Sequence, residues 1–435
     1  MKTVLIYTSP ARGHLYPMMD VALALKAAGR RVVVQTLAEE AARVVGAGLE
    51  HRPIDPRIEA IPLDDYRGGS PPAQLKRTLA CWSRRAPFEV EDLQKSRDAL
   101  DPDLLLVDAN TWGASAFAAA GTRPWAMFLP YVLPVPSRDA PAFGPGMPPP
   151  GGWVGRLRDR AFWALVNLTA REALSSLNAL RGTLDLPPLA NFPDLYLQSD
   201  LLLYRTAEPF DYPRSDWPSN VRAIGPGLWA PPGETPPWLQ DLPHPRVLVS
   251  VSTELQEDGA IIKTALEALR DEPGSIIVTT AALDPDLFEK PHDRTVITRF
   301  LPHAEVIPEV DLVVTHGGMG TTQRALAAGV PVCVVPWGRD QSESARRAAV
   351  CGAGTFVSRS RLRPERLRTA LREALGLKPG AERISAAFQA AGGAERAVTL
   401  LDDLVAGSDR AVGGGAGPST APSTAPSTAP STPTR

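Results

Sequence analysis

The stretch DLVVTHGGMGTTQRALAAGVPVCVVP, residues 311–336, decides the fold. It predicts a buried strand over 311–316, a glycine-rich turn, a helix over 323–328 and a second buried strand over 330–336. Continuously apolar strands joined through a helix are typical of a parallel sheet that is covered on both faces.

The same alternation of strand and helix recurs along most of the chain. We expect strands in the first half at 3–9, 31–36, 103–108 and 124–130, with helices at 17–28 and 111–120. In the second half, strands are expected at 246–252, 275–281 and 295–300, ahead of the stretch quoted above. The prediction is an α/β protein with two facing Rossmann-like domains and a cleft between them.

Proline and glycine divide the chain into parts, since 45 of its 435 residues are proline. Residues 225–243 predict a linker between an N-terminal domain, 1–224, and a C-terminal domain, 244–406, closed by a helix near 394–405. Residues 130–153 predict a long loop, and a helix follows at 154–184. The PSTA-repeating tail, 407–435, contains few apolar residues and is expected to be disordered.

Composition excludes several classes of protein. The net charge of −2 gives no global case for nucleic acid or an acidic membrane, and no apolar run reaches the ~18 residues that a membrane span needs. Three cysteines without CxxC spacing, and a start without signal-peptide features, favour the cytosol. The six histidines lie apart, so no metal site is expected.

Two polar residues follow neighbouring strands of the first domain. His14 follows the first strand, and Asp108 ends the strand at 103–108, so both belong to the ligand-binding edge of the sheet. A histidine there could serve as a general base and the carboxylate could fix its tautomer. Alternatively, His14 could cap the helix or simply face solvent, and Asp108 could cap the helix that follows it.

The run HGGMGTT, residues 316–322, carries the strongest signal for a ligand. Gly317, Gly318 and Gly320 would let a diphosphate approach the backbone at a helix N-terminus, with His316 and Thr321 as further donors. A tight turn alone would need only one glycine. Asp340 and Gln341 could bind sugar hydroxyls, or they could be solvated loop residues. Thr253 could bind a phosphate, or it could cap a helix.

Together these motifs resemble family 1 glycosyltransferases of the GT-B fold, in particular bacterial enzymes that glycosylate antibiotics and other natural products. The resemblance extends from the first strand to about residue 405, and residues 299–357 are its most specific part. Ser252 and Ser344 stand where many members have Gly and Asn. His303 stands where many plant members have Gln, whereas bacterial members often carry His.

The resemblance implies a role for each candidate residue. His14 matches the catalytic base and Asp108 its charge partner. Phe300, Leu301 and Pro302 match the site of the nucleotide base, and Asp340 and Gln341 match the donor-sugar contact. The residues that match the diphosphate site are His316, Gly317, Gly318, Gly320 and Thr321, together with Thr253. The implied reaction is inverting, metal-independent transfer from a TDP- or UDP-sugar, which is a co-substrate; no cofactor is implied.

An apolar small-molecule acceptor is expected against the N-terminal domain. Its candidate contacts are the aromatic residues Trp82, Trp112, Phe128, Tyr131 and Phe143, with Phe88 and Trp153 nearby, although several of these could be core residues. Rival interpretations are a nucleotide-sugar epimerase and a non-catalytic partner protein of the same fold. A monomer or a homodimer is compatible with the sequence.

Overall fold

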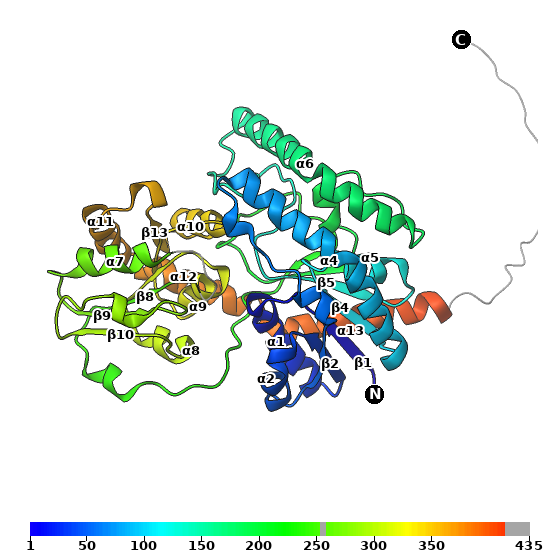
Figure 1. Cartoon of the computed structure of the whole chain (residues 1–435), viewed down its shortest axis with the longest axis horizontal. Coiled ribbons are helices and arrows are strands. Elements are labelled where there is room, and N and C mark those ends of the chain that lie inside the picture. Colours follow the sequence, from blue (N-terminus) through cyan, green and yellow to red (C-terminus); the bar gives the residue numbers. More distant parts are fainter. Residues whose placement is uncertain (253–257, 414–435) are drawn as a thin grey trace, which may run out of the picture.

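Two parallel sheets, each flanked by helices, form the protein in the computed structural model (Figure 1). The structure describes residues 1–252 and 258–413, with backbone only for 409–413. The predicted fold class is confirmed, since both sheets are parallel throughout.

The first sheet has the order β3-β2-β1-β4-β5-β6-β7. Its strands are β1 (Thr3–Tyr7), β2 (Arg31–Thr36), β3 (Glu50–Pro53), β4 (Leu104–Asp108), β5 (Trp125–Leu129), β6 (Leu201–Tyr204) and β7 (Val221–Ala223). The strand order reverses at β1, which pairs with β2 on one side and with β4 on the other. Ligands bind at such switch points, at the carboxyl ends of the strands.

The second sheet has the order β10-β9-β8-β11-β12-β13. Its strands are β8 (Arg246–Ser250), β9 (Ser275–Thr279), β10 (Thr295–Thr298), β11 (Leu312–Thr315), β12 (Val332–Val334) and β13 (Gly354–Phe356). Its switch point lies between β8 and β11, where Ser250 pairs with Thr315.

Helices cover both sheets. Around the first lie α1 (Arg12–Ala27), α2 (Ala41–Gly46), α3 (Pro56–Glu59), α4 (Pro71–Leu100), α5 (Trp112–Ala120) and α6 (Trp153–Gly182). Around the second lie α7 (Gly259–Leu269), α8 (His303–Val306), α9 (Met319–Ala327), α10 (Gln341–Val350), α11 (Pro364–Leu375) and α12 (Lys378–Ala390). Among the described residues, no helix is long and apolar enough to cross a lipid bilayer.

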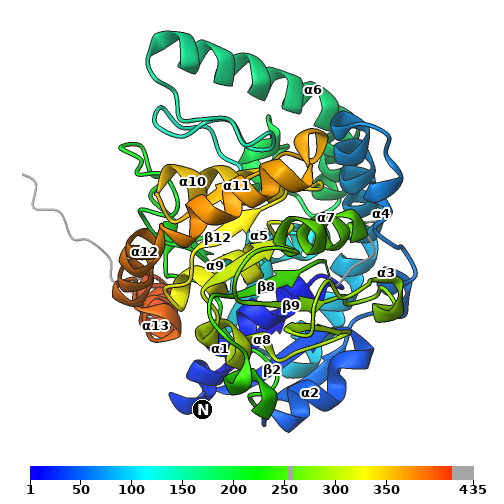
Figure 2. The same ribbon diagram turned by 90° about the vertical axis from the view of Figure 1, so that its left-hand side faces the viewer.

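The last helix, α13 (Gly393–Gly413), corrects the expected end of the second domain. Ala397, Leu401 and Val405 are buried in the core of the first sheet, and Figure 2 shows α13 beside α1. The helix also continues past residue 406, into the segment expected to be disordered; residues 414–435 lie outside the described part.

Some elements escaped the sequence patterns. The helix α4 was not predicted because it carries prolines, including Pro87 inside it, and many charged residues. The strands β3, β6, β7 and β13 were also missed, since each has only three or four residues. Short strands carry too little periodicity to separate from loops.

Candidate active site

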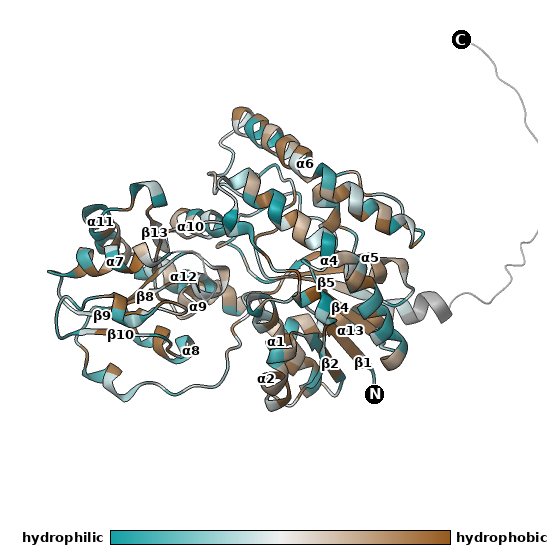
Figure 3. Cartoon of the chain, viewed as in Figure 1, coloured by the Kyte–Doolittle hydropathy of each residue, from teal (hydrophilic) through white to brown (hydrophobic). Residues whose placement is uncertain are grey.

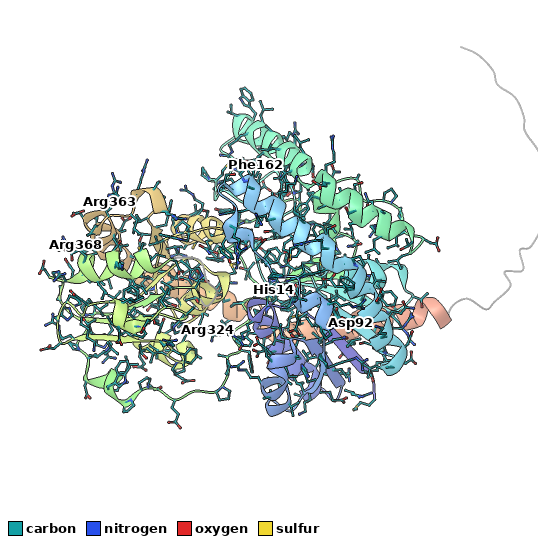
Figure 4. The ribbon with its side chains drawn as sticks, in the orientation of Figure 1. His14, Asp92, Phe162, Arg324, Arg363 and Arg368 are labelled. Atoms are coloured by element: carbon teal, nitrogen blue, oxygen red, sulfur yellow. The ribbon has the colours of Figure 1, made fainter. Side chains whose placement is uncertain are left out.

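His14 and Asp108 meet at the switch point of the first sheet. The register pairs Tyr7 with Val107, so the loop after β1 lies beside the end of β4. His14 lies in the first turn of α1, and its Nδ1 is 2.8 Å from Oδ1 of Asp108. Figure 4 places His14 on the side of the first domain that faces the second.

Asp108 is held as a carboxylate. Its Oδ2 accepts hydrogen bonds from the Ser9 backbone nitrogen (2.9 Å) and hydroxyl (2.5 Å), and its Oδ1 accepts one from the Asn110 nitrogen (3.1 Å). Burial favours a higher pKa for Asp108, but His14 and these hydrogen bonds outweigh it and lower that pKa. The charged carboxylate accepts Nδ1–H, which leaves the lone pair of His14 on Nε2.

Asn110 lies on the other side of the imidazole. Its amide nitrogen is 3.1 Å from His14 Nε2, and its amide oxygen accepts a hydrogen bond from the Tyr131 hydroxyl at 2.8 Å. The Tyr131 hydroxyl is also 3.2 Å from that of Tyr196. Sequence reasoning missed Asn110; its position two residues after Asp108, at a strand end, was the available signal.

The glycine-rich turn lies at the switch point of the second sheet, between β11 and α9. Gly317 has a φ of +99°, and a Cβ there would lie 2.8 Å from Val334 Cγ1, so the fold itself requires this glycine. A Cβ on Gly318 would meet His316 Nε2 at 2.7 Å. A Cβ on Gly320, by contrast, would meet no atom within 4 Å, so packing does not explain the glycine at that position.

Asp340, in the second domain, interacts electrostatically with His14 in the first domain. It immediately precedes α10, and burial raises its pKa while the nearby His14 opposes the rise. A domain-spanning ion pair lies close by, since Arg339 Nε is 2.9 Å from Asp65 Oδ2. The carboxyl ends of the two sheets therefore face each other.

Gln341 has a structural role that the sequence did not indicate. Its side-chain oxygen accepts hydrogen bonds from the backbone nitrogens of Trp337 (2.7 Å) and Gly338 (3.0 Å), which shapes the turn before α10. A sugar contact through Gln341 would therefore use its amide nitrogen.

The remaining donor candidates differ in exposure. Phe300 is 74% exposed, whereas Leu301 packs in the core of the second domain. Pro302 precedes α8, and His303 lies 3.2 Å from the Thr279 hydroxyl. Thr253 lies outside the described residues.

The structure corrects two of the five acceptor candidates. Phe128 is 0% and Trp112 1% exposed, so both are core residues. Phe128 lies under the Arg205 guanidinium, and Trp112 packs between Trp82 and Phe192.

The three other acceptor candidates are partly exposed. Tyr131 lies beside His14, with ring centroids 5.8 Å apart. Phe143 packs between the cores of the two domains, and Trp82 lies against Trp112. Of the nearby aromatics, Phe88 lies under Arg57, and Trp153 stands at the exposed start of α6.

The loop before α6 is anchored to the second domain. Glu343, in the first turn of α10, accepts hydrogen bonds from the backbone nitrogens of Gly144 (2.8 Å) and Gly146 (2.9 Å). Its other carboxylate oxygen is 2.6 Å from Arg347, which also reaches Asp211 at 2.7 Å. The long loop predicted at residues 130–153 is therefore docked on the helix that follows Asp340.

The chain is similar to known proteins along nearly its whole length. Residues 263–392 match the family described as the C-terminal domain of erythromycin biosynthesis protein CIII-like proteins. The 4'-demethylrebeccamycin synthase of Lentzea aerocolonigenes is 30% identical, over 92% of this chain and 99% of that protein. The demethyllactenocin mycarosyltransferase of Streptomyces fradiae is 27% identical, over 93% and 87%.

Solved structures share the fold. The glycosyltransferase of kitacinnamycin superposes with a TM-score of 0.73 at 22% identity, over 93% of this chain and 98% of that one. The glycosyltransferase VinC, solved with dTDP, has a TM-score of 0.66 at 22% identity, over 93% and 100%. With the full-length likeness to the rebeccamycin enzyme, these findings show that the chain belongs to the family 1 GT-B glycosyltransferases, with the enzymes of antibiotic and natural-product pathways.

Proposed function

We propose that this glycosyltransferase transfers a sugar from a TDP- or UDP-sugar to a hydroxyl group of an apolar small molecule, with inversion at the anomeric carbon. One observation carries the proposal. His14, paired with Asp108 and with its lone pair on Nε2, lies near enough to Asp340 of the other domain for the two charges to interact. Next to Asp340, the Gln341 carbonyl oxygen would be 2.9 Å from a Cβ on Gly317, so the glycine-rich turn before α9 borders the same place. A base and an anion site then stand on opposite sides of the space where the reacting atoms would meet.

The proposed step is a single displacement. The acceptor oxygen attacks the anomeric carbon while His14 Nε2 takes the hydroxyl proton, and the bond from that carbon to the diphosphate oxygen breaks. The electron pair leaves with the diphosphate. Asp108 stabilises the imidazolium that forms, and Ser9 keeps the carboxylate oriented.

The second domain supplies the stabilisation of the leaving group. The first backbone N–H groups of α9 have no partners within the helix, and the helix dipole favours negative charge at that end. The absence of any side chain at Gly320 leaves the backbone open there. We therefore expect full activity in EDTA, and a strict metal requirement would contradict this stabilisation.

The acceptor is expected between Tyr131 and Phe143, on the first domain. Tyr131 places a ring beside His14, and Phe143 lies in the loop anchored to α10. Trp82 lies against Trp112. A cytosolic location remains part of the proposal, in keeping with three cysteines that form no disulfide.

The test is a mass-spectrometric screen of TDP- and UDP-sugars against polyketide, flavonoid and peptide aglycones. Transfer with inverted anomeric configuration, lost in His14→Ala while calorimetric donor binding persists, supports the proposal. General-base help is worth about 10²–10⁴-fold in turnover. Isomerised sugar without an acceptor would instead indicate an epimerase, and donor binding without turnover a non-catalytic partner.

A further inference from the structure

The helix α6 carries an unusual concentration of exposed apolar side chains. Its outward side presents Trp153, Val154, Leu157, Leu165 and Leu168, which are 72, 61, 58, 50 and 59% exposed. Ala161 and Ala164 are exposed between them. We call these seven residues the α6 stripe. Monomeric soluble proteins rarely expose apolar residues contiguously, so the stripe calls for a partner.

The stripe forms one continuous face of the helix. At about 100° of rotation per residue, all seven side chains fall within an arc of about 120°. With a rise of about 1.5 Å per residue, residues 153–168 extend over roughly 24 Å. Figure 3 shows hydrophobic segments recurring along α6, and Figure 1 shows this helix at the outer edge of the molecule.

The opposite face of α6 already has its partners. Trp163, Val166, Ala170 and Leu177 are buried in the core of the first domain. The helix also packs along α4. The stripe therefore faces outward, because the inner side of the helix is packed against the rest of the first domain.

The charges beside the stripe decide what fits it. Arg156, Arg160 and Arg171 are exposed and fall along one edge of the stripe. Glu172, an acidic residue on the same side of α6 as the stripe, is paired with Lys76 of α4 at 3.0 Å. A second copy of the chain would bring like charges together, whereas an anionic lipid surface offers apolar tails to the stripe and phosphates to the arginines.

We propose that the α6 stripe and its three arginines dock this enzyme on an anionic membrane surface, with α6 lying in the plane of the headgroups. The same part of α6 supports the loop before it. Arg158 donates a hydrogen bond to the Pro148 carbonyl at 2.9 Å, and Phe162, labelled in Figure 4, belongs to this turn of the helix. Docking therefore places the loop that carries Phe143 beside the lipid, from which an apolar acceptor could be taken up; only this link to the acceptor rests on the proposed function.

The experiment is co-sedimentation of the full-length protein with vesicles. We expect binding to vesicles of phosphatidylcholine with phosphatidylglycerol, weaker binding to phosphatidylcholine alone, and release by salt. A variant with Leu157, Leu165 and Leu168 changed to Ser should lose at least about tenfold in partitioning, because apolar burial is removed. A variant with Arg156, Arg160 and Arg171 changed to Gln should lose a similar factor on anionic vesicles only, because each arginine near the surface contributes separately.

The matched control changes Val45, Leu287 and Val350 to Ser, since these side chains are 59, 65 and 51% exposed on other elements. It should bind vesicles as the wild type does. Absence of wild-type binding to anionic vesicles, or equal binding by all variants, would overturn the proposal. So would a homodimer that the three Leu→Ser changes dissociate. If the three Leu→Ser changes prevent folding, vesicle binding by the arginine variant tests the proposal instead. None of these measurements depends on turnover.

Discussion

Substitution of Asp108 by Asn tests the catalytic assignment most sharply. The carboxylate accepts four hydrogen bonds: Oδ1 from His14 and the Asn110 nitrogen, Oδ2 from the nitrogen and hydroxyl of Ser9. An amide has one oxygen and one NH₂ group, so in either orientation the NH₂ group faces donors. If it faces His14, the imidazole must carry its proton on Nε2 and cannot act as the base.

The expected size of both effects follows from these bonds. Loss of the correct tautomer should lower kcat by about 10²–10⁴-fold. A buried backbone N–H left without an acceptor should cost about 1–3 kcal/mol of unfolding free energy. Since the folded-state pKa of Asp108 is lowered, its charge stabilises the protein above the unfolded-state pKa of about 3.9, and this contribution is lost as the pH falls.

The assay combines kcat for the donor and acceptor pair found in the screen, donor Kd by calorimetry, and denaturant unfolding at neutral and acidic pH. Donor Kd should stay unchanged, and the stability deficit should shrink at low pH. Asp92→Asn is the matched control. That buried carboxylate accepts from the Tyr7 hydroxyl and the Asp55 nitrogen, both at 3.0 Å, outside the dyad. Near-wild-type kcat in folded Asp108→Asn protein would refute the role of the dyad.

Three further substitutions examine the surroundings of the site. Asn110→Ala should lower kcat about fivefold without changing donor Kd, because the ring of His14 loses one orienting hydrogen bond worth about 1 kcal/mol; equal kcat would show that the bond is incidental. Glu343→Gln should cost about 3 kcal/mol in denaturant unfolding, because Arg347 loses a buried charged partner; unchanged stability would mean that the Arg347–Glu343 ion pair contributes little. Glu89 is a buried residue of α4 whose carboxyl group accepts a hydrogen bond from the Gly113 nitrogen at 2.8 Å, and burial raises its pKa to about 8. Wild-type stability should therefore fall as the pH rises from about 4.3 to 8, and Glu89→Gln should flatten that slope in thermal unfolding; parallel curves would contradict it.

The sequence predicted those features that depend on interactions between residues close together in the chain. Apolar runs predicted nine of the strands, because a strand that is buried on both faces must be apolar at nearly every position. The sequence did not predict α4, because prolines and many charged residues obscure the helical pattern of this segment. The helix packs against α5 and α6. The acceptor aromatics show the same limit. Phe128 lies inside the strand predicted at 124–130 and Tyr131 follows it, but only the packed structure shows that Phe128 is fully buried and that Tyr131 lies beside His14.

The sequence by itself determined the two Rossmann-like halves, the strand-end positions of His14 and Asp108, and the glycine-rich turn, because each depends on neighbouring residues in the chain. Only the tertiary structure decided that Asn110 and Tyr131 join the dyad and that Glu343 anchors the loop before α6. It also brought α13 back to the first domain and left the α6 stripe exposed. These features depend on contacts between segments that are distant in sequence, which form only when both sheets and their helices are packed.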